Sequence, residues 1–396
     1  MSPGFGAVAA VLLVAASLRS AITVVGPVLD QIGAATGLGH AALGLLGAVP
    51  LLAFAVVSPM VHVMAARFSP ESSLIVALAA ITVGTGIRSV PGNGFLWCGT
   101  ALLGAGIAVG NVLVPSIVKR DFAGQVQLMT GVYAAVMSGM AAIASGLAAP
   151  LARWTGSWRW ALACWAAVSA VAVLVWILRR RPTGTEPPAG AVSAAAENPS
   201  NTVNVWASAR AWQVTAFMGS QSCSFYVLVT WLPSVEADRG VSETTSGIYL
   251  FVYQLIGIIA GVFVAVPLRR RQQSGVAVAI TVPMVVGSAG LIALPALAPL
   301  WVIVAGVSSG CGIVVALAFI GLRSSEHSVT ARLSGMAQSV GYLIAALALL
   351  GAGLLAGAAG DRSVLWLVLA IGCVQLVPAW LAGRAGFVDS VSPRQS

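Results

Sequence analysis

The chain has 396 residues, of which 59% are hydrophobic and only 8% are charged, and its mean hydropathy is +0.96. In soluble domains about a quarter of the residues are charged, so this composition excludes a soluble protein and indicates an integral membrane protein. The net charge of +9 does not indicate nucleic-acid binding, because the basic residues lie in short groups at the ends of apolar runs. The five cysteines are widely spaced without a CxxC pair, so the sequence predicts neither a disulfide framework nor a metal site.

Apolar runs long enough to cross a bilayer as helices recur in two sets of six. They cover about 5–29, 41–63, 73–90, 95–118, 127–150 and 158–178, and then about 211–235, 244–267, 275–296, 299–322, 332–357 and 363–383. We therefore expect an all-α integral membrane protein with 12 transmembrane helices, divided into an N-terminal bundle over 1–178 and a C-terminal bundle over 210–396 with a short cytoplasmic tail. Residues 179–209 open with three arginines and continue through Pro, Gly, Ser and Asn, which predicts a flexible cytoplasmic linker.

The first apolar run contains a single cation, Arg19, in the stretch SLRSAITVVGPVL. It lies 14 residues beyond Phe5, which corresponds to about 21 Å of helix and places it far from either end of the run. A lone guanidinium at that depth costs roughly 2.5–3.5 kcal/mol on insertion scales, so we expect it to face a polar cavity or a partner. Thr23, Gly26 and Asp30 follow at helical spacing on the same face. The stripe indicates either a structural ion pair or a fixed positive charge for an anionic or electron-rich ligand.

The basic residues also predict the orientation of the chain. If the N-terminus is cytoplasmic, 14 of the 20 Lys and Arg residues lie at inner helix ends. The outer ends then hold Arg88, Arg153, Arg159, Arg239 and Arg362. This asymmetry predicts that both termini are cytoplasmic. The excess of Arg over Lys, with abundant Ala and Gly, suggests a GC-rich bacterial genome, and we expect the protein in the bacterial cytoplasmic membrane.

The two sets of helices resemble each other at a nearly constant offset. Pro27 corresponds to Pro233 at an offset of 206 residues, and Leu128 corresponds to Leu333 at 205. Two parallel halves of six helices describe the major facilitator architecture, and internal repeats point to solute sites near the bilayer midplane.

The repeat also predicts which residues of the two halves correspond. At an offset of 206, Arg19 corresponds to Phe225 and Asp30 to Glu236. A cation in one half thus matches an aromatic ring in the other. This pairing suits a planar, electron-rich or anionic ligand.

Several motifs resemble one known family. They are LRSAITVVGPVL in the first run, GAGIAVGNVLVPSIVKRDF over 104–122, LMTGVY over 128–133 and WRWALACW over 158–165. Together they resemble the cyanate and 2-nitroimidazole permeases (CynX/NimT) of the major facilitator superfamily, most strongly over residues 17–165. The resemblance implies a permease for a small anion such as cyanate or a planar solute such as a 2-nitroimidazole.

One loop departs from the pattern of the superfamily. Between the second and third runs, the usual GxxxDRxG motif is replaced by His62, Ala66, Arg67 and Ser69, which leaves only the arginine. The usual charge relay at the cytoplasmic side is therefore in doubt, and Arg67 could instead interact with helix ends.

Eleven side chains are candidate substrate contacts, because they place a charge, an amide, a hydroxyl or an aromatic ring in otherwise apolar runs. They are Arg19, Thr23, Asn111, Tyr133, Gln221, Phe225, Tyr226, Tyr249, Tyr253, Gln338 and Tyr342. Helix packing explains Asn111 as well as ligand contact does. Six charged residues at helix ends are candidates for gating: Asp30, Arg67, Lys119, Arg120, Asp121 and Glu236. Asp30 and Glu236 are also the options for proton coupling, although helix capping or outer gating is the favoured role.

The sequence favours a secondary carrier that works by alternating access. No P-loop is present, so ATP is not the direct energy source. Drug or xenobiotic efflux is the alternative. An intramembrane enzyme using Ser308 or Ser309 is disfavoured because no histidine or lysine lies at membrane depth to activate them, and a channel would need polar stripes on several helices. We expect no catalytic residue, metal or cofactor. The expected partners are a small solute and membrane lipid, with a coupling ion as an option; no nucleic acid is expected, and the protein is predicted to be a monomer.

Overall fold

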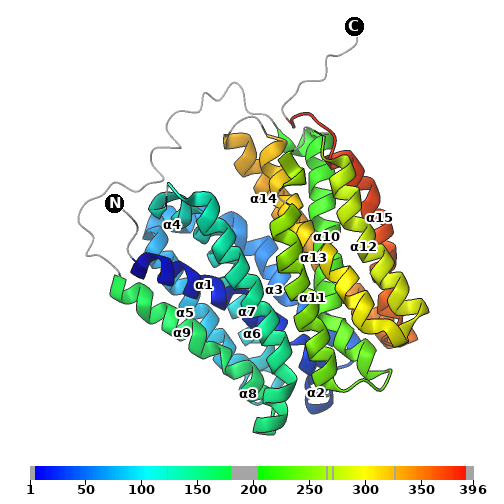
Figure 1. The fold of residues 1–396 in the computed structure, drawn as a ribbon. Coiled ribbons are helices and arrows are strands. Elements are labelled where there is room, and N and C mark those ends of the chain that lie inside the picture. The colour runs from blue at the N-terminus through cyan, green and yellow to red at the C-terminus, as the bar shows by residue number, and fades with distance from the viewer. Residues whose placement is uncertain are drawn as a thin grey trace. The chain divides into compact units, whose positions relative to one another are not determined.

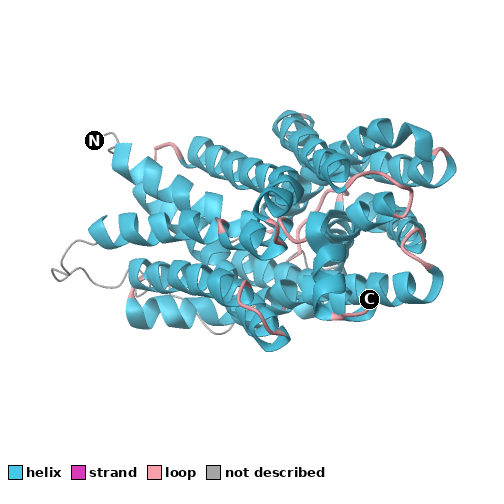
Figure 2. Cartoon of the chain, turned by 90° about the horizontal axis from the view of Figure 1, so that it is seen from below, coloured by secondary structure: helices cyan, strands magenta, loops and turns pink. Residues whose placement is uncertain are grey.

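The computed structural model describes residues 5–122, 124–179, 204–264, 266–269, 272–324 and 327–388. Throughout these ranges the regular structure is helical, and Figure 2 shows helices joined by loops. Most of the predicted linker, residues 180–203, and the tail from residue 389 lie outside the described ranges.

The chain divides into two compact units. Figure 1 labels the helices and colours them in chain order. The first unit comprises Met1–Ser200 with Val229–Phe251, and the second comprises Asn201–Leu228 with Val252–Ser396. Two helices, α10 and α11, contribute residues to both units. The expected division into bundles over 1–178 and 210–396 remains a prediction.

The helices of the first unit agree with the predicted apolar runs to within a few residues, apart from breaks at Gly26–Val28, Ser58–Met60 and Cys164. They are α1 (Phe5–Thr23), α2 (Leu29–Thr36), α3 (His40–Val57), α4 (Val61–Phe68), α5 (Pro70–Arg88), α6 (Asn93–Asp121), α7 (Val126–Thr155), α8 (Trp158–Ala163) and α9 (Trp165–Arg179). In this unit α5 packs against α6 and α9, and α1 packs against α7 and α9. Small residues allow the closest approach, because a Cβ added at Gly84 of α5 would lie 2.7 Å from the backbone of α6.

The second unit is built from the remaining helices. They are the first part of α10 (Ala209–Ala237), most of α11 (Glu243–Val264), α12 (Ser274–Ala293), α13 (Ala298–Leu322), α14 (His327–Ala359) and α15 (Ser363–Ala382). The helix α12 packs against both α13 and α15. Phe217 and Phe319 lie in the hydrophobic core of the second unit, with ring centroids 5.5 Å apart.

Within the described residues, 11 helical segments are long and apolar enough to cross a membrane. The remaining long helix, α10, has 29 residues and is therefore also long enough. Its Ser, Thr and Gln residues lower its hydropathy below that of the others. The expected all-helical membrane fold is confirmed.

The first predicted run is not one continuous helix. The helix α1 ends at Thr23, a short 3₁₀ turn (η1) spans Gly26–Val28, and α2 begins at Leu29. Pro27 explains the break, because it has no backbone N–H to donate to residue 23 and its ring disfavours a helical interior. The expected stripe from Arg19 to Asp30 on a single helix is therefore wrong beyond Thr23, and Asp30 belongs to a separate helix.

The second unit depends on close packing of α11 against α13. A Cβ added at Gly310 would overlap the carbonyl oxygen of Gly257, and one added at Gly257 would lie 3.1 Å from the backbone nitrogen of Gly310. Such small-residue seams are the usual way in which transmembrane helices approach closely.

We expect Gly310→Ala to destabilise the protein by about 1–3 kcal/mol, the usual cost of overpacking. The added methyl group must push α11 away from α13. Gly321→Ala in the same helix is the matched control, since a Cβ there meets nothing within 4 Å. The measurement is the melting temperature of the purified protein. Equal melting temperatures for the two variants would show that the seam does not carry this packing.

Candidate functional site

The first unit holds Arg19 half-buried on α1, close to a polar junction with α7. Four residues further on, Thr23 is 1% exposed and its hydroxyl donates to the carbonyl oxygens of Ala141, at 3.0 Å, and Arg19, at 3.2 Å. The hydroxyl of Ser145 donates in turn to the carbonyl oxygen of Thr23 at 3.1 Å. Because its proton is already shared by two carbonyl oxygens, Thr23 serves to join α1 to α7 in this structure.

Three other candidates lie in the same unit. Asn111 on α6, Tyr133 on α7 and Tyr249 on α11 are each half-buried. Their side chains thus remain accessible enough to contact a ligand, and their assignment as substrate contacts stays a prediction.

The second unit brings four predicted aromatic residues together from three helices. The ring of Phe225 stacks on Tyr253 with centroids 6.3 Å apart and planes 26° apart, and it meets Tyr226 edge-on at 5.0 Å. Tyr226 in turn meets Tyr342 edge-on at 6.4 Å. We call Phe225, Tyr226, Tyr253 and Tyr342 the aromatic cluster. Offset and edge-to-face pairs of this kind are the preferred arrangements of aromatic rings.

One polar atom of the aromatic cluster is buried with little to bond to. Tyr253 is 0% exposed, and among the described residues its phenolic hydroxyl makes no hydrogen bond of ordinary geometry, although the Ser309 side chain lies near it. The hydroxyl of Ser224, beside Phe225 in sequence, likewise makes no hydrogen bond within the described residues. Leaving a buried hydroxyl unsatisfied costs roughly 1–3 kcal/mol. These two groups are therefore well suited to a ligand that carries hydrogen-bonding atoms.

The two glutamines predicted as substrate contacts are engaged locally. The amide of Gln221 donates to the hydroxyl of Ser222 at 2.7 Å and to the carbonyl oxygen of Met218 at 3.2 Å. The amide of Gln338 donates to the hydroxyl of Ser334 at 2.8 Å. Gln221 thus keeps its amide oxygen for a ligand, and Gln338 keeps its amide oxygen and one N–H.

The predicted outer gate is built within the first unit from α2 and the end of α10. The hydroxyl of Ser234 donates to a carboxylate oxygen of Asp30 at 2.6 Å, and Arg239 donates to Glu236 at 2.8 Å. A Cβ on Gly26 would overlap the carbonyl oxygen of Val229, so only glycine permits this approach. Asp30 and Glu236 thus lie at the same end of the unit, as the repeat predicts.

Neighbouring contacts at this end were not predicted from the sequence. The amide of Gln31 donates to Glu243 at 2.6 Å, and the rings of His40 and Trp231 stack at 6.2 Å. These partners are about two hundred residues apart in sequence. No local pattern identifies them.

The opposite end of the first unit carries the other predicted gating residues. Arg120, at the end of α6, pairs with Glu71 of α5 and with Asp121, the latter at 2.7 Å. Arg67 lies over the ring of Phe68, 5.6 Å from its centroid. Lys119 is exposed. Glu71, which the sequence analysis did not select, thus supplies a carboxylate close in sequence to the altered loop motif.

In the second unit, a buried arginine joins the end of α13 to the end of α15. Arg323 is 3% exposed and donates to the carbonyl oxygens of Ala382, at 2.8 Å, and Gly383, at 3.1 Å, and to the side chain of Gln273. Burial lowers the pKa of Arg323, and the nearby charge of Arg210 lowers it further. The carbonyl oxygens at the end of α15 thus hold the cation, which gives it a structural role.

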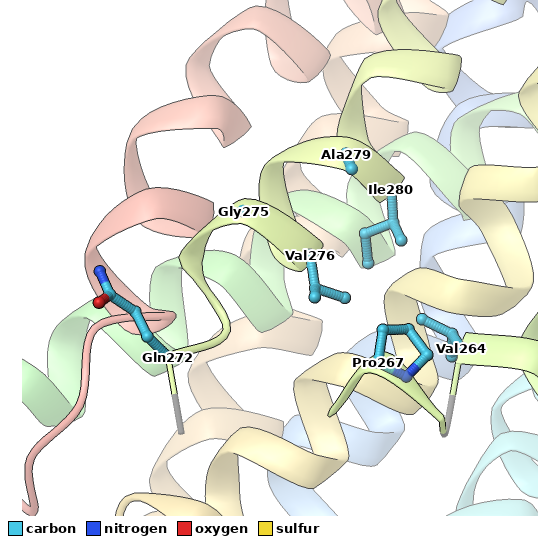
Figure 3. Close-up of a pocket in the computed structure, with 7 residues that line it drawn as sticks. All are labelled: Val264, Pro267, Gln272, Gly275, Val276, Ala279 and Ile280. Carbon is cyan, nitrogen blue, oxygen red and sulfur yellow. The ribbon is translucent and has the colours of Figure 1, made fainter. Parts of the chain in front are cut away.

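The second unit also contains an apolar pocket of about 310 Å³ where α11 leads into α12. Figure 3 shows Val264, Pro267, Val276 and Ile280 around it, with the amide of Gln272 directed away from these apolar side chains. None of the candidate substrate contacts lines it. We therefore do not place the solute there.

The fold and these clusters define a class of protein: a polytopic, all-helical membrane protein whose polar and aromatic groups gather inside the helical units. The family model of the Major Facilitator Superfamily matches residues 11–349. The chain belongs to the Major Facilitator Superfamily and is a transporter, not an enzyme.

Individual proteins agree with this assignment. The chain is 38% identical over 340 residues to the 2-nitroimidazole transporter of Escherichia coli strain K12, covering 86% of this chain and 85% of that protein. It is 26% identical to the cyanate transport protein CynX of the same organism, covering 92% of this chain and 94% of that protein. Among solved structures, the inward-open xylose transporter XylE from E. coli matches with a TM-score of 0.76 at 12% identity over 94% of this chain and 95% of that chain. The resemblance to the cyanate and 2-nitroimidazole permeases is thereby confirmed.

The hydrogen bond between Ser234 and Asp30 yields a prediction. We expect Ser234→Ala and Asp30→Ala each to lower the melting temperature, and the double variant to fall no further than the more damaging single change. A hydrogen bond to a charged group, discounted because Asp30 is exposed, contributes about 1 kcal/mol. Ser220→Ala is the control, since the hydroxyl of Ser220 bonds only within its own helix. Additive losses for Ser234 and Asp30 would contradict the pairing.

Proposed function

We propose that the protein transports a small anionic or planar, electron-rich solute by alternating access. The observation that carries the proposal is the aromatic cluster of the second unit with its buried Tyr253 hydroxyl. Stacking rings favour a planar solute, and the buried hydroxyl favours one that accepts or donates a hydrogen bond.

The first unit contributes Arg19 to the proposal. A guanidinium presents a planar fork of donors that matches a carboxylate, nitro or cyanate-like group. The relatives named above, a 2-nitroimidazole transporter and a cyanate transport protein, support this choice of solute. Asn111, Tyr133, Gln221, Tyr249 and Gln338 are proposed as further contacts.

Efflux of a planar drug or xenobiotic is the second candidate function. The aromatic cluster favours it, because aromatic side chains bind planar apolar compounds without requiring a charge. Arg19 instead favours transport of an anion. In the first function Arg19 of the first unit dominates recognition of the solute, and in the second function the aromatic cluster of the second unit does.

Gating and partners complete the proposal. Asp30 with Ser234 and Glu236 with Arg239 are proposed to act at the outer side, and Arg67, Lys119, Arg120 and Asp121 at the inner side. A coupling ion and a monomeric state are proposed from the usual behaviour of such carriers.

Arg19 provides the direct test of transport. We expect Arg19→Lys to reduce uptake in proteoliposomes severalfold, because it keeps the charge and loses the donor fork, and Arg19→Gln to abolish it. Cyanate and 2-nitroimidazole are the probes, and thermal stabilisation by each is measured alongside uptake.

The same experiment tests the aromatic cluster with Phe225→Leu. This variant should reduce uptake of 2-nitroimidazole, and the thermal stabilisation it gives, more than those of cyanate. Phe217→Leu on the same helix is its control, because Phe217 packs on Phe319 outside the aromatic cluster. If Arg19→Gln keeps full ligand-induced stabilisation, Arg19 does not bind solute. If both Phe225→Leu and Phe217→Leu leave selectivity unchanged, the aromatic cluster does not recognise solute.

We also propose that the protein lies in the bacterial cytoplasmic membrane with both termini and the 179–209 linker in the cytoplasm, because most basic residues are then inside. In a variant without native cysteines, a cysteine at Ser193 should react with an impermeant maleimide only after the membrane is opened. Labelling of this cysteine in intact cells would contradict the proposed orientation.

A further inference from the structure

The first unit contains a buried cation outside the proposed transport site. Arg88, the last residue of α5, is 1% exposed, and its Nε and Nη2 atoms have no hydrogen-bond partner. A guanidinium remains charged in proteins, so burial cannot be relieved by loss of a proton. An uncompensated buried charge of this kind calls for a counter-charge.

None of the described carboxylates of the first unit is seen to supply that counter-charge. Asp30 accepts from Ser234, Glu71 and Asp121 pair with Arg120, Glu236 pairs with Arg239, Glu243 accepts from Gln31, and Asp238 is exposed. The position of Arg88 at the C-terminal end of α5 provides a favourable helix dipole but no acceptor for its N–H groups. Within the described residues, the Nε and Nη2 donors of Arg88 therefore lack both a hydrogen-bond partner and a paired carboxylate.

Other unsatisfied donors lie in the same part of the unit. The hydroxyl of Thr85 is 0% exposed and unpartnered, and Thr85 lies three residues before Arg88, on the same side of α5. Cys164, between α8 and α9, is close enough to Arg88 to interact with it electrostatically, and the indole N–H of the next residue, Trp165, is buried without an acceptor. The groups that lack partners here are mainly donors, which favours an acceptor over a water molecule, since water must also place its own protons.

We propose that Arg88 binds a small monovalent anion such as chloride inside the first unit, separately from the transported solute. One guanidinium matches one negative charge, and the tight packing around Arg88 admits only a single small ion, for which neighbouring side chains must move slightly. The hydroxyl of Thr85 completes the site. The anion stabilises the packing of α5 against α6 and α9.

The test is the melting temperature of the purified full-length protein in gluconate buffer, with chloride replacing gluconate at constant ionic strength. For the unmodified chain, the melting temperature should rise saturably with chloride. Arg88→Met should remove this dependence, because an apolar side chain of similar length leaves no charge to neutralise. Arg153→Met, which replaces an exposed arginine of the same unit, should keep the full chloride response.

Two further variants make the outcome decisive. Thr85→Val keeps the charge and removes the hydroxyl, so it should shift the chloride midpoint severalfold higher; it decides the question if Arg88→Met does not fold. Arg19→Gln should leave the midpoint unchanged, which separates this site from the transport site. The proposal is overturned if the unmodified chain shows no saturable response, if Arg88→Met retains it, if Thr85→Val leaves the midpoint unchanged, or if Arg19→Gln removes the response.

Discussion

Hydrocarbon offers no hydrogen bonds, and the placement of polar side chains in this protein follows from that constraint. Most buried hydroxyls donate to a carbonyl oxygen of their own helix one turn earlier, as Ser20 does to Ala16 at 3.0 Å and Thr215 to Ala211 at 2.8 Å. Such bonds satisfy the side chain without another helix. The exceptions are therefore informative, because a polar group left without a partner is costly unless a ligand or a conformational change supplies one.

Two of the exceptions differ in their chemistry. In the second unit, the Tyr253 hydroxyl belongs to a cluster of stacked rings, an environment that suits a planar organic solute. In the first unit, Arg88 carries a full charge with no carboxylate partner, an environment that suits an anion. This difference between a neutral donor among rings and a buried cation is why we propose a solute contact for one and an ion site for the other.

Close packing gives the second theme, and it depends on residues with no side chain. Gly26 permits the backbone of α10 to approach the turn between α1 and α2, and Gly310 permits α11 to meet α13. Lipid provides no hydrophobic driving force between helices, so van der Waals contact and interhelical hydrogen bonds must hold them. The contact at Gly26 also brings Ser234 within hydrogen-bonding distance of Asp30. The close packing and this hydrogen bond thus depend on the same helix crossing.

The sequence alone determined the membrane class, the helical segments and the superfamily. The length of an apolar run decides whether it can span a bilayer, and both run length and motif spacing are local properties of the sequence. It also selected all four members of the aromatic cluster, since the repeat and the i+4 spacing indicate which residues share a face. Only the tertiary structure decided that Pro27 ends the first helix before Asp30, that Thr23 bonds to α7, and that Glu71 pairs with Arg120. It alone showed Arg88 to be buried without a partner, whereas charge counting placed it among the outer anchors. These features arise from contacts between segments that are distant in sequence. The periodicity of a single helix does not indicate which side chains of another helix will contact it.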